Sequence, residues 1–185
     1  MSTYDVNMGI GNETGMAYHA PAGTALPAYP GEELAEAWKE IGAVSEDGIS
    51  YGMNHSLEPL RNWAKQIERL MAADGDATVK APFIDTTEST LKTLFGEENV
   101  VVTEATKDHG KLISVDIGPD TQTPAEAFLF LMKDGDDMLM IGTTRGFVTE
   151  VGDIDFAPDD AITWEATISA KSWTVMKDNG QTISG

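Results

Sequence analysis

The most regular feature of the chain is a series of short runs in which apolar and polar residues alternate. In residues 161–170, Ile162, Trp164, Ala166 and Ile168 alternate with polar residues, as expected for a half-buried strand. Similar β-rich runs, separated by turn-forming residues, cover 78–84, 99–103, 111–117, 125–133, 138–142 and 146–151. The pattern predicts a mainly β fold, a β-sandwich of two packed sheets or a barrel.

Two segments instead have apolar residues at helical spacing. Asp85 precedes one of them as a predicted N-cap, with Glu88 at the capping-box position and Gly96 at the end. A second, shorter helix is predicted over 33–41, because it ends before Gly42 and repeats apolar residues every three to four positions. The segment from Pro59 to Asp74 is ambiguous, since its apolar stripe also fits an amphipathic helix.

Residues 125–133 are apolar on both faces of the predicted strand. Phe128 and Phe130 would point to one face, and Leu129 and Leu131 to the other. We therefore expect this strand to be buried, either within the core or between subunits.

Composition narrows the function classes. The 185 residues fit one domain and include no cysteine, which excludes disulfides and thiolate chemistry. The N-terminus lacks a basic signal-peptide start, so synthesis in a cytoplasm without export is expected. The formal charge of −19 disfavours binding to nucleic acid, whose phosphates would be repelled.

One catalytic motif is present in outline. Residues 48–52 match the G-x-S-x-G pattern of a hydrolase nucleophile elbow, and Ser50, Asp85 and His109 follow the order of a hydrolase triad. A helix does not follow Gly52 in the predicted pattern, however, so the match is expected to be fortuitous. We predict no enzyme activity.

No cofactor or metal site is predicted. The histidines His19, His55 and His109 lack the spacing of a metal site. Acidic clusters between 134 and 160 fit hairpin turns better than calcium loops, although calcium binding stays open.

Four weak sequence features follow one another along the chain. They are the strand–turn–strand segment Ile41–Ser50, then Trp63, Thr78, Lys80 and Ile84, then Thr90–Gly96, and finally Gly146–Ile154 with Asp160–Trp164. In this order and spacing the chain resembles, over residues 20–171, the major tail proteins, which are the tail-tube subunits of long-tailed, non-contractile bacteriophages. In the family the residues after the tryptophan begin a strand, which favours a strand for Pro59–Asp74.

The resemblance implies a structural virion protein with a tail-tube-like fold. The expected fold has two packed sheets, one flanking α-helix, an extended loop and terminal arms, divided into an arm at 1–24, a β-sandwich domain at 25–172 and an arm at 173–185. The expected assembly is a tube of stacked hexameric rings around a tape-measure protein, completed by tail terminator and distal tail proteins. Genomic DNA would pass through the channel without specific binding, and no membrane is involved.

Two sets of residues are expected to serve the assembly. The region between 47 and 63 is a long polar connection, and in the resembling family such a loop mediates ring stacking. Its candidate residues are Asp47, Gly48, Ser50, Tyr51, Met53, Asn54, His55, Leu60 and Trp63. An acidic channel wall would repel the genome, and its candidates are Asp134, Asp136, Asp137, Glu150, Asp153 and Asp155.

Three other functions remain open from the sequence. The first is another protein on the same scaffold, such as a tail terminator, a baseplate subunit or a secretion-system tube protein. The second is a small serine hydrolase that uses Ser50. The third is an acidic sandwich that binds carbohydrate or calcium.

Overall fold

The computed structural model describes residues 17–118, 121–154 and 162–180, and it leaves out the side chains of residues 55–58 and 68–74. Most of the described chain forms one antiparallel sheet with the strand order β2-β1-β7-β8-β9-β4-β3. Its strands are β1 (Ala17–Pro21), β2 (Lys39–Glu40), β3 (Ser50–Arg61), β4 (Ile67–Phe83), β7 (Glu126–Asp134), β8 (Asp137–Val151), β9 (Trp164–Ala170) and β10 (Thr174–Asp178).

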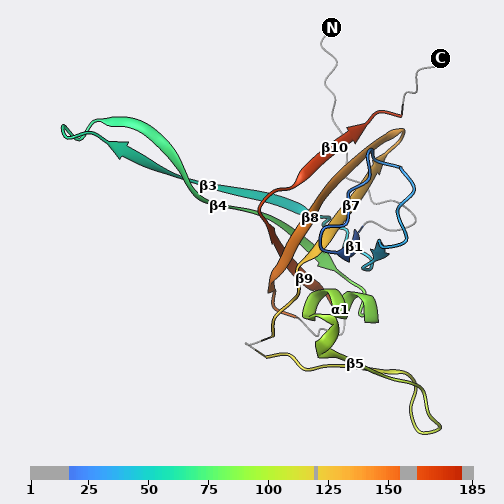
Figure 1. The fold of residues 1–185 in the computed structure, drawn as a ribbon. Coiled ribbons are helices and arrows are strands. Elements are labelled where there is room, and N and C mark those ends of the chain that lie inside the picture. Colours follow the sequence, from blue (N-terminus) through green and yellow to red (C-terminus); the bar gives the residue numbers. More distant parts are fainter. Residues whose placement is uncertain (1–16, 119–120, 155–161, 181–185) are drawn as a thin grey trace.

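The long strand β8 organises this sheet. One edge of β8 pairs with β7, and the other edge pairs with β10 near its start and with β9 near its end. A second sheet contains β5 (Val100–Thr103) and β6 (Leu112–Val115). A mainly β fold with two sheets and a flanking α-helix is therefore confirmed for the described residues (Figure 1).

Strand β7 is buried on both faces, as its sequence predicts. Phe128 and Phe130 belong to the main core, whereas Leu129 and Leu131 belong to a second cluster on the other side of the sheet. Trp38 is part of that second cluster. The chain itself thus covers both faces of β7, so burial between subunits is not needed to explain its composition.

The helix α1 (Glu88–Phe95) packs against the main core near the start of β9. The rings of Phe95 and Trp164 meet edge to face with centroids 5.8 Å apart, a favourable aromatic geometry. A short 3-10 turn, η1 (Glu97–Asn99), follows the C-cap Gly96. The predicted N-cap was wrong: Thr87 accepts the Thr90 amide, while Asp85 accepts the amide of Ala43 at 2.8 Å.

The predicted helix over 33–41 is absent. A turn closed by the Trp38 amide and the Ala35 carbonyl precedes β2, which pairs with β1. Trp38 and Ile41 are buried in different clusters, on opposite sides of the sheet. A helix would place the apolar residues of its stripe on one side, so tertiary packing decides the conformation here.

The ambiguous segment Pro59–Asp74 is the distal part of a long β-hairpin. Its backbone belongs to β3 and β4, which pair from Ser50↔Lys80 to Arg61↔Ile67 with two irregularities in register. The sequence also predicted a polar connection over 47–63, but most of this segment is the strand β3. The turn before β3 is present, with the Gly48 amide bonded to the Ser45 carbonyl.

Two strands lie within the segments predicted as arms. β1 lies between the edge strand β2 and β7, and β10 pairs with β8. Residues 1–16 and 181–185 of those segments lie outside the described residues.

Candidate functional site

The β3–β4 hairpin extends away from the body of the molecule, clear of the rest of the sheet (Figure 1). β4 pairs with β9 only from Ala77 to Phe83, so its more distal residues pair with β3 alone. The seven residue steps from Asn54 to Arg61 correspond to roughly 23 Å of strand. The hairpin is therefore a projecting arm of two strands, and no third strand pairs with it in the described chain.

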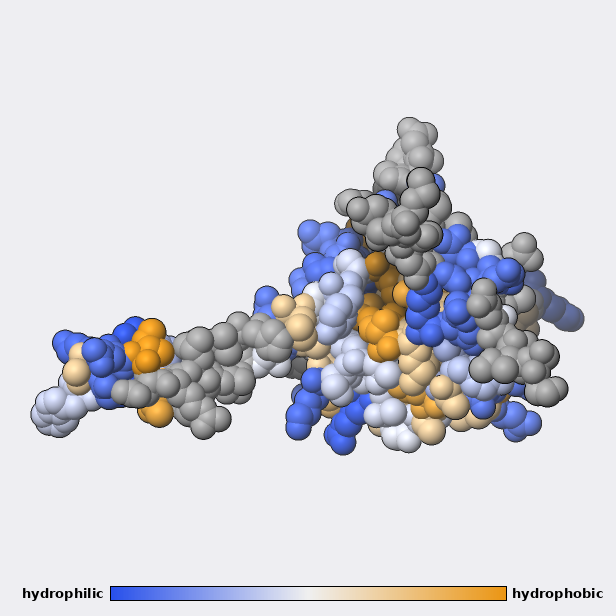
Figure 2. All heavy atoms as spheres, turned by 90° about the horizontal axis from the view of Figure 1, so that it is seen from above, coloured by the Kyte–Doolittle hydropathy of each residue, from blue (hydrophilic) through white to orange (hydrophobic). Residues whose placement is uncertain are grey.

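Large apolar side chains are exposed at the end of this arm. Trp63 lies in the turn with a relative exposure of 103%, and Leu60 and Ile67 on the flanking strands are 51% and 54% exposed. Figure 2 shows apolar atoms near the end of the projection, separate from those of the body. Such a group, isolated from the chain's own core, is typical of an interaction surface.

Backbone and side-chain hydrogen bonds hold the hairpin turn in one conformation. The Asn62 amide donates to the Gln66 carbonyl at 3.0 Å, and the Asn62 side chain accepts the Gln66 amide at 3.0 Å. The Arg61 guanidinium donates to the carbonyl of Lys65, which has a φ of 62°. The turn is thus organised before any partner binds, which lowers the entropic cost of docking.

The predicted inter-ring residues are distributed along this hairpin. Asp47 and Gly48 lie in the exposed turn at its base, and Ser50, Tyr51, Met53 and Asn54 are exposed on β3. His55 is also on β3, Leu60 is near the end, and Trp63 is at the turn. Sequence reasoning missed the tip residues Arg61, Lys65 and Ile67, although the concentration of basic residues there could have indicated them.

The predicted channel-wall acids do not form one group. Asp134, Asp136 and Asp137 lie at the β7–β8 turn, where Asp137 pairs with Lys177 at 3.1 Å. Glu150 lies near the other end of β8, at most roughly 43 Å of strand from Asp137. Asp153 follows β8 and is exposed, and Asp155 lies outside the described residues.

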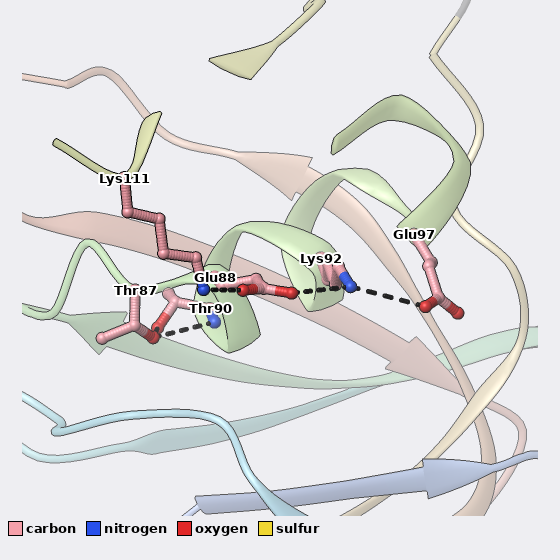
Figure 3. Close-up of polar contacts among 6 residues, drawn as sticks. All are labelled: Thr87, Glu88, Thr90, Lys92, Glu97 and Lys111. Carbon is pink, nitrogen blue, oxygen red and sulfur yellow. Dashed lines mark hydrogen bonds and ion pairs between the residues drawn. The ribbon is translucent and has the colours of Figure 1, made fainter. Parts of the chain in front are cut away.

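A group of ion pairs attaches the β5–β6 hairpin to α1 (Figure 3). The Glu88 carboxylate binds Lys111 Nζ at 2.8 Å and Lys92 Nζ at 2.9 Å, and Lys92 also lies 3.5 Å from Glu97. Hydrogen bonds from Lys111 and then Lys92 lower the pKa of Glu88 to about 2. Glu88 thus connects α1 to the β5–β6 hairpin rather than forming a capping box.

This lowered pKa predicts how stability depends on pH. Because the pKa of Glu88 is lower in the folded state, its stabilising effect is present above the unfolded value of about 4.3 and disappears as pH falls towards 2. Glu88→Gln should therefore lower the midpoint of urea unfolding at pH 7 but not at pH 2. The matched control Glu98→Gln, at an exposed position, should change neither midpoint, whereas an equal loss at both pH values for Glu88→Gln would contradict the assignment.

The hydrolase motif does not have the required structural context. Ser50 is exposed and begins β3, so a strand follows it where a nucleophile elbow requires a helix. The contacts of Asp85 and His109 are with the Ala43 amide and the Gly110 carbonyl. The geometry gives no support to a catalytic role for Ser50.

The described part of the chain offers neither a metal-binding cluster nor a membrane-spanning helix. His19 lies 3.0 Å from Glu126, and no group of three or more His, Asp or Glu residues there could hold a metal ion. No helix in the described ranges has the length and hydropathy needed to span a bilayer.

Comparison with known proteins identifies the family of this chain. The model of the phage tail tube protein family matches residues 6–178, and no curated protein matches the chain.

Similar solved structures include three that align over most of the chain. The tube-terminating cap of the anti-feeding prophage has 9% sequence identity and a TM-score of 0.47, and the match covers 96% of this chain and 97% of that chain. The tail of an empty gene transfer agent particle has 10% identity and a TM-score of 0.43, with 88% of this chain and 96% of that chain covered. The virion of a native gene transfer agent has 10% identity and a TM-score of 0.40, with 90% of this chain and 98% of that chain covered. Because these TM-scores are below 0.5, the assignment rests on the family match. The chain belongs to the phage tail tube protein family and is a structural protein of the virion tail.

Proposed function

We propose that this chain is the subunit of stacked hexameric rings whose channel conducts the phage genome during ejection. Membership of the tail tube family supports assembly into a tube, and the sixfold ring is what the sequence resemblance implies. The observation that carries the proposal is the projecting β3–β4 hairpin with its exposed apolar tip. A tape-measure protein, a tail terminator and distal tail proteins are the further partners of such a tube.

The hairpin is the proposed contact between rings. An isolated two-stranded hairpin is only marginally stable in water, so a long projection of this kind is expected to gain a partner. Its outer strand β3 is the last strand of the sheet order, and its outer edge is unpaired among the described strands. Docking on the next ring would cover Trp63 and the neighbouring apolar side chains.

Ring closure and stacking need two different interfaces. Both are heterologous, because a different patch of each subunit must meet its neighbour. The sheet offers exposed strand edges for closure at β3 and at the two-residue strand β2. Strand edges of this type can pair with another chain through their free backbone groups.

One face of the sheet has the composition expected of a channel wall. Pairing of β3 with β4 and of β4 with β9 places Ser50, Lys80 and Thr167 on one face, and Thr78 and Ser169 beside them. Most of these side chains are exposed or half-buried. We assign this face to the channel, because most of these side chains are small hydroxyl groups that give DNA no dense positive charge. Phe147, which pairs in register with Ser169 and is 41% exposed, is a large apolar side chain on the same face.

The net charge of this face is slightly negative. Glu150 pairs in register with Thr167 and so shares the face, as do Asp76 and Glu165. The cations are Lys80, which lies 3.6 Å from Glu165, and Arg145. Two cations and three acids leave 2 − 3 = −1 per subunit, so of the predicted channel acids Glu150 is the one that we retain.

Assembly of the purified protein tests the proposal. Static light scattering should report particles far larger than a 19.9 kDa monomer as the concentration is raised. A protein that stays monomeric at every concentration and salt, also with its tape-measure partner, would contradict the proposal. Rings that form but never stack would instead indicate a tail terminator.

A further inference from the structure

The hairpin tip has the opposite charge to the rest of the chain. Residues 61–69 contain Arg61, Lys65 and Arg69 against Glu68, which gives 3 − 1 = +2. The whole chain has a charge of −19, so the other residues together carry −19 − 2 = −21. Nine residues thus hold three of the twelve basic side chains, and the tip is the part of the molecule best suited to approach an acidic surface.

The apolar component of the tip restricts its partner further. Trp63 is fully exposed at the turn, between the exposed Leu60 and Ile67. A tryptophan can bury about 150–250 Å² on binding, and aromatic and arginine residues dominate interface energies. The complementary surface should therefore combine an apolar hollow with surrounding acids.

The body of the same chain has such a surface. Ala28, Tyr29 and Pro30 on one side and Met176–Asn179 on the other line an open hollow of about 660 Å³. Tyr29 is 53% exposed there. The hollow is large enough to accept an indole ring, and its apolar lining includes Pro30 and Met176.

Acidic residues surround this hollow. Asp178 is part of its lining, and the β7–β8 turn with Asp134, Asp136 and Asp137 lies next to it, since β10 pairs with the start of β8. A fifth acid is Glu32, whose carboxylate accepts a hydrogen bond from the amide of Ala28 in the lining. Against these five acids stand Lys133 and Lys177, which leaves 2 − 5 = −3. The charge around the hollow is thus opposite in sign to the +2 of the hairpin tip.

In Figure 1 the hairpin projects to the left of the body, whereas the end of β10, whose residues line the hollow, lies at the upper right. A rigid molecule of this shape cannot place its tip in its own hollow. A second copy can, and a contact between two different patches repeats along an axis instead of closing as a dimer.

We infer that the hairpin tip of one copy docks in the Tyr29–Met176 hollow of a copy in the next ring, with Trp63 inserted and with the net positive charge of the tip facing the acids around the hollow, which include Asp136 and Asp178. This inference rests on the proposed stacking function and names its receptor. Long-range attraction between the two patches also favours this orientation over the approach of two acidic bodies.

Charge reversal on the full-length protein tests the contact. Lys65→Glu with Arg69→Glu changes the tip charge from +2 to −2 and retains Arg61, which holds the turn. The concentration needed for tube growth should rise at least about tenfold, given several exposed ion pairs per ring. Lys107→Glu with Lys171→Glu is the matched control, because it makes the same charge change at exposed positions elsewhere.

Reciprocal reversal identifies the receptor. Asp136→Lys with Asp178→Lys should impair growth alone and restore it when combined with the reversed tip. If tubes grow normally from the reversed tip, or if the combination gives no recovery, this docking site is wrong. Other results would contradict the stacking function itself: wild-type protein that forms no tubes, or tubes that grow without the hairpin. If the tip binds DNA or a tape-measure peptide and stacking is unaffected, the docking inference is also wrong.

Discussion

Tubes should fail to elongate when the distal hairpin is removed. Replacing residues 56–74 by Asn-Gly joins His55 to Gly75, which are paired in the native register, through a two-residue turn that such hairpins favour. The shortened subunit should keep its core and unfold at a similar temperature, because that core lies in the body. Single rings should form, but electron micrographs should contain no tubes.

A matched truncation tests whether the effect is specific to this hairpin. Replacing residues 105–109 by Asn-Gly shortens the β5–β6 connection and retains Lys111, which pairs with Glu88. This control should assemble normally. If the subunit with the shortened β3–β4 hairpin forms tubes of ordinary length, the proposed contact between rings is wrong.

Reversing the charge of the proposed channel face should strongly slow DNA ejection. Asp76→Lys with Glu150→Lys changes the face from −1 to +3 per subunit, or from 6 × −1 = −6 to 6 × 3 = +18 per hexameric ring. Lysines along the wall would release counterions from DNA at many phosphates together, so we expect ejection at least about tenfold slower. Tail length should be unchanged.

Virions with Glu98→Lys and Asp108→Lys are the control for overall charge. These positions are exposed near α1 and in the β5–β6 connection, and they carry the same charge change away from the proposed channel. Ejection should then match the wild type. Equal rates for both variants would argue against the assigned face.

Much of the fold could be predicted because local sequence and tertiary burial agree. The two-faced apolar run of β7 and the helix that ends at Gly96 are both present. The helix predicted over 33–41 was wrong, because the spacing of apolar residues does not reveal that Trp38 and Ile41 pack into different clusters. β1 was missed because five residues of mixed polarity are too short for a clear period, and pairing with β7 supplies the order.

The candidate site was predictable only in outline. The sequence located the region around Trp63 but suggested a polar connection, because the described side chains of β3 are exposed and therefore give no regular burial pattern. The hollow joins residues 28–30 to 176–179, and no local pattern connects segments so distant in sequence. The division of the acids between the two ends of β8 likewise depends on the length of that strand.

The proposed tube is tested most directly by helical reconstruction from cryo-electron micrographs of the purified wild-type protein at high concentration. The expected result is stacked rings of six subunits, with each β3–β4 hairpin contacting a subunit of the next ring and the Lys80–Glu165 face directed into the channel. Particles without stacked rings, or tubes in which the hairpins contact only their own ring, would contradict this account.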